Sequence, residues 1–141
     1  MYEPIPYQGP TIVSANGIQI CYDAFGNPGK PPLLMVAGLG MQLIGWEEAL
    51  CTLLAERGYW VIRYDNRDVG LSTRFDEAGT PNFMAVLQGQ EVSAPYLLGD
   101  MAADAIGLLD ALGSKQAHIL GASLGGMIAQ TIAINHPERV I

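Results

Sequence analysis

Three short apolar runs divide the chain, and turn-forming residues border each of them. The runs occupy residues 33–37, 59–64 and 117–120. A continuous apolar run of this length is typical of a strand buried on both faces, as in a parallel sheet. We therefore predict three buried strands, separated by stretches long enough to hold helices.

Helical spacing of apolar residues between these runs predicts helices over residues 46–57, 96–112 and 124–136. Gly58 and Gly113 follow the first two helices, and Pro137 follows the third. Glycine just after a helix, and proline beyond it, are common signals of a C-terminal end. Residues 65–95 show no such pattern, so we expect a loop there.

The N-terminal part has an extended pattern over residues 11–14 and 18–25, interrupted by Asn16-Gly17. This dipeptide is a strong signal for a β-hairpin. Val140 and Ile141 have the character of the start of another strand. The resulting order, a hairpin followed by alternating strands and helices, predicts an α/β fold. We expect a three-layer sandwich with a mostly parallel sheet and an N-terminal antiparallel hairpin.

Composition narrows the classes of function. The 141 residues fit one domain, and with 50% apolar and 15% charged residues they do not match a disordered chain. A net charge of −7 disfavours binding to nucleic acid or to an anionic membrane. No apolar run approaches the roughly 20 residues of a membrane helix, and residues 1–6 lack the pattern of a signal peptide.

Two cysteines, Cys21 and Cys51, form neither a disulfide framework nor a metal motif, and the two histidines add no ligand set. We therefore expect no metal and no cofactor, and a cytoplasmic location as the default.

The sharpest chemical signal is Gly-x-Ser-x-Gly over residues 121–125, centred on Ser123. It stands between a predicted strand and a predicted helix, which is the setting of a nucleophile elbow. The turn is strained, so small residues two before and two after the serine must let strand and helix approach closely. The helix N-terminus then lies beneath the oxyanion that forms on the substrate. The alternative is a glycine-rich turn with an incidental serine.

An oxyanion hole in such a site takes one N–H from the residue after the nucleophile and one from the loop after an earlier strand. Leu124 would supply the first N–H, and Leu39 in the loop at residues 38–41 would supply the second. Nearby apolar residues either line an acyl pocket or belong to the core, and the sequence leaves both options open: Met41, Leu43, Ile44 and Trp46.

A third motif, residues 63–72, ends a strand in a loop of short polar residues. Asp65 is expected to bind backbone N–H groups ahead of it and fix the turn, and Arg67 to tie the turn together. We favour this structural role over catalysis by Asp65 or Asp68.

Together these motifs resemble the α/β hydrolase superfamily, in particular its serine esterase and lipase-like branch, over nearly the whole chain. The same branch includes enzymes similar to aclacinomycin methylesterase. Two positions depart from the family pattern: Ala37 replaces a common His, and Asp68 stands where Gly is usual. The resemblance implies that Ser123 attacks a small-molecule carboxylic ester and forms an acyl-enzyme. Serine at this position disfavours dehalogenase and epoxide hydrolase chemistry, which use aspartate.

An activated serine needs a base within hydrogen-bond reach. His118 lies five residues before Ser123 on the same strand, about 16 Å away at roughly 3.3 Å per residue. His136 lies 13 residues after it, about 20 Å away along a helix at 1.5 Å per residue. We expect neither histidine to be the base.

The family order, serine then acid then histidine, implies that the missing members follow Ile141. Residues 1–141 would then be the N-terminal portion of one domain, an incomplete α/β hydrolase fold with little activity alone. A partner chain carrying the C-terminal part, or self-association, would complete the sheet.

Three other functions remain open. A non-catalytic hydrolase-like fragment or assembly domain fits the absence of a base, and a cofactor-free perhydrolase would share the same triad. A dinucleotide-binding domain is suggested by Gly38-Leu39-Gly40 after a strand, with Asp65 ending the next strand. Leu43 stands where that motif needs its third glycine, and this alternative leaves the Ser123 motif unexplained.

Overall fold

Five strands form one sheet in the computed structural model, which describes residues 4–141. They are β1 (Tyr7–Ala15), β2 (Ile18–Phe25), β3 (Pro32–Val36), β4 (Trp60–Tyr64) and β5 (His118–Gly121), in the order β1-β2-β4-β3-β5. β3 runs parallel to β4 and β5, whereas β1 and β2 form an antiparallel hairpin that joins antiparallel to β4. The predicted fold class is confirmed. The signal-peptide prediction was made from residues 1–6, and residues 1–3 of that segment lie outside the described residues.

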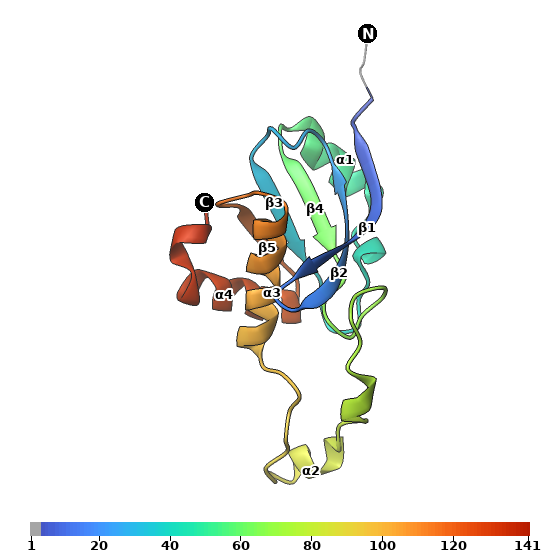
Figure 1. Cartoon of the computed structure of the whole chain (residues 1–141), viewed down its shortest axis with the longest axis vertical. Coiled ribbons are helices and arrows are strands. Elements are labelled where there is room, and N and C mark those ends of the chain that lie inside the picture. The colour runs from blue at the N-terminus through green and yellow to red at the C-terminus, as the bar shows by residue number, and fades with distance from the viewer. Residues whose placement is uncertain (1–3) are drawn as a thin grey trace.

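Helices cover both faces of the sheet (Figure 1). α1 (Glu48–Glu56) lies on one face, and α3 (Leu98–Ala111) and α4 (Leu124–Asn135) lie on the other. Successive side chains of β3 alternate between two buried clusters: Leu33 and Met35 pack with residues of α1, and Leu34 and Val36 pack with α3 and α4. Burial on both faces explains why the β3 sequence is apolar without interruption.

The stretch expected as one loop, residues 65–95, contains a short helix instead of being irregular throughout. This helix, α2 (Phe83–Leu87), begins after Asn82, whose side chain accepts a hydrogen bond from the Ala85 N–H. It lies at the tip of an arm, residues 66–97, that projects away from the sheet (Figure 1). Five residues are too few to give a helical period in the sequence, so the pattern did not reveal it.

Other element boundaries shift by a few residues. β1 begins at Tyr7 rather than at residue 11, and α3 begins at Leu98 rather than at residue 96. Within the described part of the chain there are also three single turns of 3₁₀ helix, at Leu43–Gly45, Asp76–Ala78 and Pro137–Arg139. Ends of elements are set by local caps and contacts that periodicity does not record.

One edge of the sheet is formed by β5, and residue 140 lies beside the start of this strand. Val140 forms a parallel bridge with Ala117, as expected from its sequence. Several large apolar side chains of β5, α4 and the last residue are exposed: Leu120, Met127, Ile134 and Ile141.

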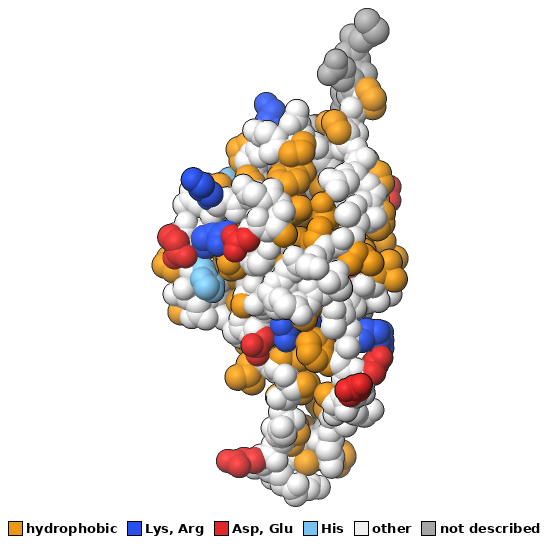
Figure 2. All heavy atoms as spheres, viewed as in Figure 1, with side chains coloured by type: hydrophobic (Ala, Val, Ile, Leu, Met, Phe, Trp, Pro, Cys, Tyr) orange, Lys and Arg blue, Asp and Glu red, His pale blue; other side chains and the backbone are white. Residues whose placement is uncertain are grey.

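In the view of Figure 2, hydrophobic side chains extend over the body and onto the arm, and basic side chains lie mostly beside acidic ones. No helix within residues 4–141 is long and apolar enough to cross a membrane.

Candidate active site

The carboxyl ends of β3, β4 and β5 lie at one edge of the sheet because these three strands are parallel. The loops that follow them, residues 37–42, 65–72 and 122–123, therefore meet there. All three predicted motifs belong to these loops. The fold thus brings together segments that are as much as 80 residues apart in sequence.

Ser123 occupies the sharp turn between β5 and α4. Its φ of 54° and ψ of −123° lie in a region that residues other than glycine rarely adopt. The residue is exposed at the N-terminus of the 12-residue helix α4. Unpaired N–H groups and the helix dipole make this end partially positive.

Backbone contact on both sides of Ser123 explains the two flanking glycines. A Cβ atom at Gly121 would lie 2.1 Å from the Gly125 carbonyl oxygen. A Cβ atom at Gly125 would lie 2.0 Å from the carbonyl oxygen of Val36 on β3. Neither neighbour is a flexible side chain, so only glycine allows α4 to approach β3 and β5 this closely.

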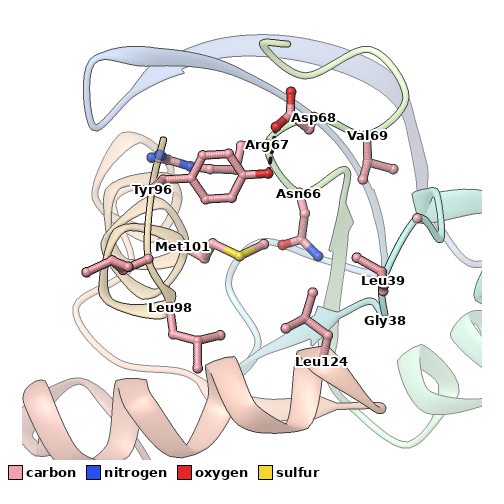
Figure 3. Close-up of a pocket in the computed structure, with 12 residues that line it drawn as sticks. Gly38, Leu39, Asn66, Arg67, Asp68, Val69, Tyr96, Leu98, Met101 and Leu124 are labelled. Atoms are coloured by element: carbon pink, nitrogen blue, oxygen red, sulfur yellow. Dashed lines mark hydrogen bonds between the residues drawn. The ribbon is translucent and has the colours of Figure 1, made fainter. Parts of the chain in front are cut away.

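The loop after β3 lies directly against the serine. A Cβ atom placed on Gly38 would be 3.4 Å from the Ser123 Cβ. Among the residues that the structure describes, neither the Leu39 N–H nor the Leu124 N–H donates to a backbone carbonyl. The exposed Leu39 side chain and the Leu124 side chain both line the same cavity beside the serine (Figure 3).

Asp65 holds the second loop through backbone donors. Its Oδ1 accepts from the Leu43 N–H at 2.7 Å, and its Oδ2 accepts from the Leu71 N–H at 2.9 Å. The same carboxylate lies so close to Gly70 that a Cβ there would be 2.1 Å from Oδ2. Oδ2 of this buried aspartate thus fixes the turn, as expected from the sequence, whereas Oδ1 joins the second loop to the segment that follows the β3 loop, a contact that the sequence did not indicate.

Arg67 differs from its expected role of tying this turn together. Its guanidinium forms a bidentate ion pair with the Asp104 carboxylate of α3, with N–O distances of 2.7 and 2.8 Å. The hydrogen bond to Asp104 raises the pKa of Arg67 further. Asn16 of the β1–β2 turn donates to the same carboxylate at 2.8 Å. Arg67 therefore connects the loop to α3, a long-range contact that no local sequence pattern indicates.

Asp68, the other departure from the family pattern, adopts a φ of 65°. A positive φ explains why glycine is common at such a position. Here the aspartate side chain is used: it accepts hydrogen bonds from the Phe75 N–H and, at 2.6 Å, from the Tyr96 hydroxyl.

A cavity of about 450 Å³ opens beside the candidate oxyanion groups. Gly38, Leu39 and Leu124 lie at one side of it, and Tyr96 and Asp68 lie opposite, with Met101 pointing inward between them (Figure 3). Ser123 stands beside this cavity and is not part of its lining. Sequence reasoning did not assign Val69, Tyr96, Leu98 and Met101 to a pocket, because only the fold brings the loop after β4, residue 96 and the start of α3 together at this edge.

The apolar residues considered for an acyl pocket lie elsewhere. Leu43 is buried, Trp46 packs against the α1 side of the core, and Ile44 is exposed. None of the four, Met41 included, lines the cavity.

Both histidines lie far from Ser123 in the fold. His118 begins β5 at the opposite end of the strand, where its ring packs edge-on against Tyr59. His136 caps the C-terminus of α4, at the other end of the helix that Ser123 begins. Neither residue lines the cavity.

Comparison with known proteins identifies the class. A family model described as the alpha/beta hydrolase fold matches residues 31–140. The chain belongs to this family, as the sequence motifs implied. The Gly38-Leu39-Gly40 segment that suggested a dinucleotide site belongs to the loop against Ser123, so the dinucleotide-binding alternative is wrong.

Two curated relatives are similar over most of this chain. Rhodomycin D methylesterase DauP from Streptomyces sp. (strain C5) is 33% identical over 130 residues, which are 92% of this chain and 39% of the relative. 3-Oxoadipate enol-lactonase 2 from Acinetobacter baylyi is 32% identical, over 90% of this chain and 40% of the relative. The chain thus spans about 40% of the length of these relatives.

Solved structures show the same arrangement. A hydrolase from Pseudomonas aeruginosa has a TM-score of 0.74 and 31% identity, over 93% of this chain and 43% of that one. Epoxide hydrolase A from Mycobacterium thermoresistibile also has a TM-score of 0.74, with 25% identity, over 94% of this chain and 36% of that one.

Proposed function

We propose that this chain carries the nucleophile and the oxyanion-binding groups of a carboxylic ester hydrolase. The observation that carries the proposal is the geometry of Ser123, an exposed serine with a φ of 54° between β5 and the N-terminus of α4. The Gly38 loop against it supports the same proposal, as do the Leu39 and Leu124 N–H groups, which donate to no backbone carbonyl within residues 4–141. The names of the relatives, a methylesterase and a lactonase, fit hydrolysis of small-molecule esters.

In this mechanism the Ser123 Oγ attacks the ester carbonyl carbon while a base takes its proton. The Leu39 and Leu124 N–H groups hold the negative oxygen of the tetrahedral intermediate. Collapse of the intermediate breaks the bond to the alcohol, which leaves protonated, and an acyl group remains on Ser123. Water then attacks the acyl-enzyme and releases the acid. Ester hydrolysis is favoured over epoxide opening because the nucleophile position holds a serine, whereas epoxide hydrolase chemistry uses an aspartate there.

We further propose that residues 1–141 are the N-terminal portion of the catalytic domain and that the base and the acid come from polypeptide outside it. The positions of His118 and His136 at the far ends of β5 and α4 support this proposal. The polypeptide that supplies them would pair beside β5, where the bridge at Val140 begins a strand and apolar side chains are exposed.

The test supplies a base from solution. Hydrolysis of p-nitrophenyl acetate is followed with increasing imidazole for the unmodified chain and for Ser123→Ala, whose rate gives the background. We expect an excess rate that depends on Ser123 and rises with imidazole. The matched control is Ser93→Ala, which replaces an exposed serine in a loop. This variant should keep the imidazole-dependent excess rate of hydrolysis.

Two results would contradict these proposals. An excess rate that is absent at every imidazole concentration excludes Ser123 as the nucleophile. Loss of the excess in His118→Gln or His136→Gln, with the fold intact by circular dichroism, would place the base within this chain. The mass of the denatured preparation reveals whether a second polypeptide accompanies the chain. Sedimentation of the native protein separates such a partner from self-association.

A further inference from the structure

Two neighbouring cavities lie on the side of the candidate site that faces the arm, and they share one wall. The first is the cavity of about 450 Å³ beside Leu39 and Leu124. The second, of about 590 Å³, lies under the arm and is lined in part by Phe75, Pro81 and Val92. Among residues 4–141, only Asp68 and Tyr96 line both cavities. These two residues therefore form the wall between them.

Side-chain contacts fix Tyr96 in this wall. Its hydroxyl donates to Asp68 Oδ2 at 2.6 Å, and its ring lies 5.4 Å from the Phe75 ring between centroids. The Arg67 guanidinium lies over both rings, 4.9 Å from Tyr96 and 5.1 Å from Phe75. Burial and the neighbouring Asp68 carboxylate raise the pKa of Tyr96 to about 12, so the hydroxyl remains a donor at neutral pH.

The charges of this wall are paired, and the other side chains that line the first cavity are apolar except for Asn66, whose amide donates to the Ala37 carbonyl at 3.1 Å. Arg67 is neutralised by Asp104, and the Asp68 carboxylate is engaged by Tyr96 and the Phe75 N–H. The remaining lining includes the side chains of Leu39, Leu98, Met101 and Leu124. Beyond the oxyanion groups such a cavity fits an uncharged aliphatic group, because the charged side chains of the wall are already paired with one another or with backbone.

We propose that Tyr96, held by Asp68, sets the length of the aliphatic acyl group that the site accepts. This proposal rests on the proposed ester hydrolysis, in which the acyl group extends from the carbonyl beside Leu39 and Leu124 into the first cavity. The group ends against the Tyr96 ring. Without the ring the two cavities join, and a longer chain enters the space now lined by Phe75, Pro81 and Val92. Tyr96 is thus a specificity-determining residue.

The experiment measures binding without chemistry. Methyl esters of straight-chain acids with 4, 6, 8 and 10 carbons are titrated by calorimetry into Ser123→Ala and into the same chain carrying Tyr96→Ala. Methyl esters keep the alcohol part constant, so only acyl length varies. We expect affinity to stop rising with length in Ser123→Ala. In the double variant, the ratio of affinities for the 10-carbon and 4-carbon esters should increase about tenfold, the effect of burying two further methylenes.

Two further variants test the wall itself. Tyr96→Phe keeps the ring and loses only the hydroxyl, so the length preference should change by less than about threefold. Val92→Ala removes bulk from the second cavity alone, and the wall remains, so the preference should stay as in Ser123→Ala. Thermal unfolding checks each variant, and Tyr96→Leu, which keeps apolar packing, replaces Tyr96→Ala if the latter does not fold.

An unchanged length preference in a folded Tyr96→Ala or Tyr96→Leu variant overturns the proposal. An equal change in the 10-carbon to 4-carbon affinity ratio in Val92→Ala also overturns the proposal. In that case the arm as a whole, and not the wall, would determine the acyl length that binds. Failure of the proposed hydrolysis gives a different result: the imidazole-dependent rate is absent, whereas the binding series in Ser123→Ala is unaffected.

Discussion

The two sides of the candidate site are held by opposite means. On the Ser123 side, backbone packs on backbone, and the missing side chains of Gly121 and Gly125 are what permit the geometry. On the Tyr96 side, the backbone is kept in place by paired side chains, Arg67 with Asp104 and Asp68 with Tyr96. The first arrangement is disrupted by adding an atom to a glycine, and the second by removing one partner of a side-chain pair.

The largest effect is expected where backbone meets backbone. Gly125→Ala would place a Cβ atom 2.0 Å from the Val36 carbonyl oxygen, so β3 and α4 must separate. We expect a loss of more than about 4 kcal/mol in the free energy of unfolding, measured by chemical denaturation.

Gly126→Ala is the matched control on the same helix, since a Cβ there meets nothing closer than 3.6 Å. It should gain about 0.5–1 kcal/mol from the higher helix propensity of alanine. Equal destabilisation by both substitutions would show that close approach of α4 is not what Gly125 provides.

On the opposite side, Asp104→Ala leaves the buried Arg67 without its anionic partner. Because an unpaired buried charge is costly, we expect a loss of about 3 kcal/mol in the free energy of unfolding. Asp110→Ala removes the acid of an exposed pair with Arg139 and should cost less than about 1 kcal/mol.

A second readout locates the effect of Asp104→Ala. Hydrogen exchange should increase in the arm, residues 66–97, and should change little in β3 and β5. Faster exchange spread evenly over the chain would contradict the view that the two sides are held separately.

The smallest effect concerns the strain at Ser123. Ser123→Gly replaces a residue at a φ of 54° by one that adopts this conformation freely, so a gain of about 0.5–1 kcal/mol is expected. Ser93→Gly, in an exposed loop without a positive φ, should instead lose a few tenths of a kcal/mol. A loss of stability in Ser123→Gly, measured by denaturation, would mean that the serine side chain stabilises the turn.

Most of the fold follows from local patterns. The apolar runs, the Asn16-Gly17 turn and the helix end signals place the strands and three of the four α-helices that the structure describes in residues 4–141, because burial on one or two faces imposes a period on the sequence. The prediction of the candidate site from the sequence is less complete than that of the fold. Ser123, Leu39, Leu124 and the turn around Asp65 come from motifs in which backbone geometry restricts the residue type. Their catalytic roles stay predictions.

Local sequence patterns were enough to give the order of the strands and longer helices along the chain, the serine turn with its glycines and the family to which the chain belongs. These features depend on neighbours a few residues away, where steric limits restrict which residues fit. The tertiary structure decided what lies opposite the serine: the pairing of Arg67 with Asp104, the hydrogen bond from Tyr96 to Asp68 and the cavity between them. Those contacts join residues 28 to 37 positions apart, and their geometry exists only once α3 has packed against the sheet.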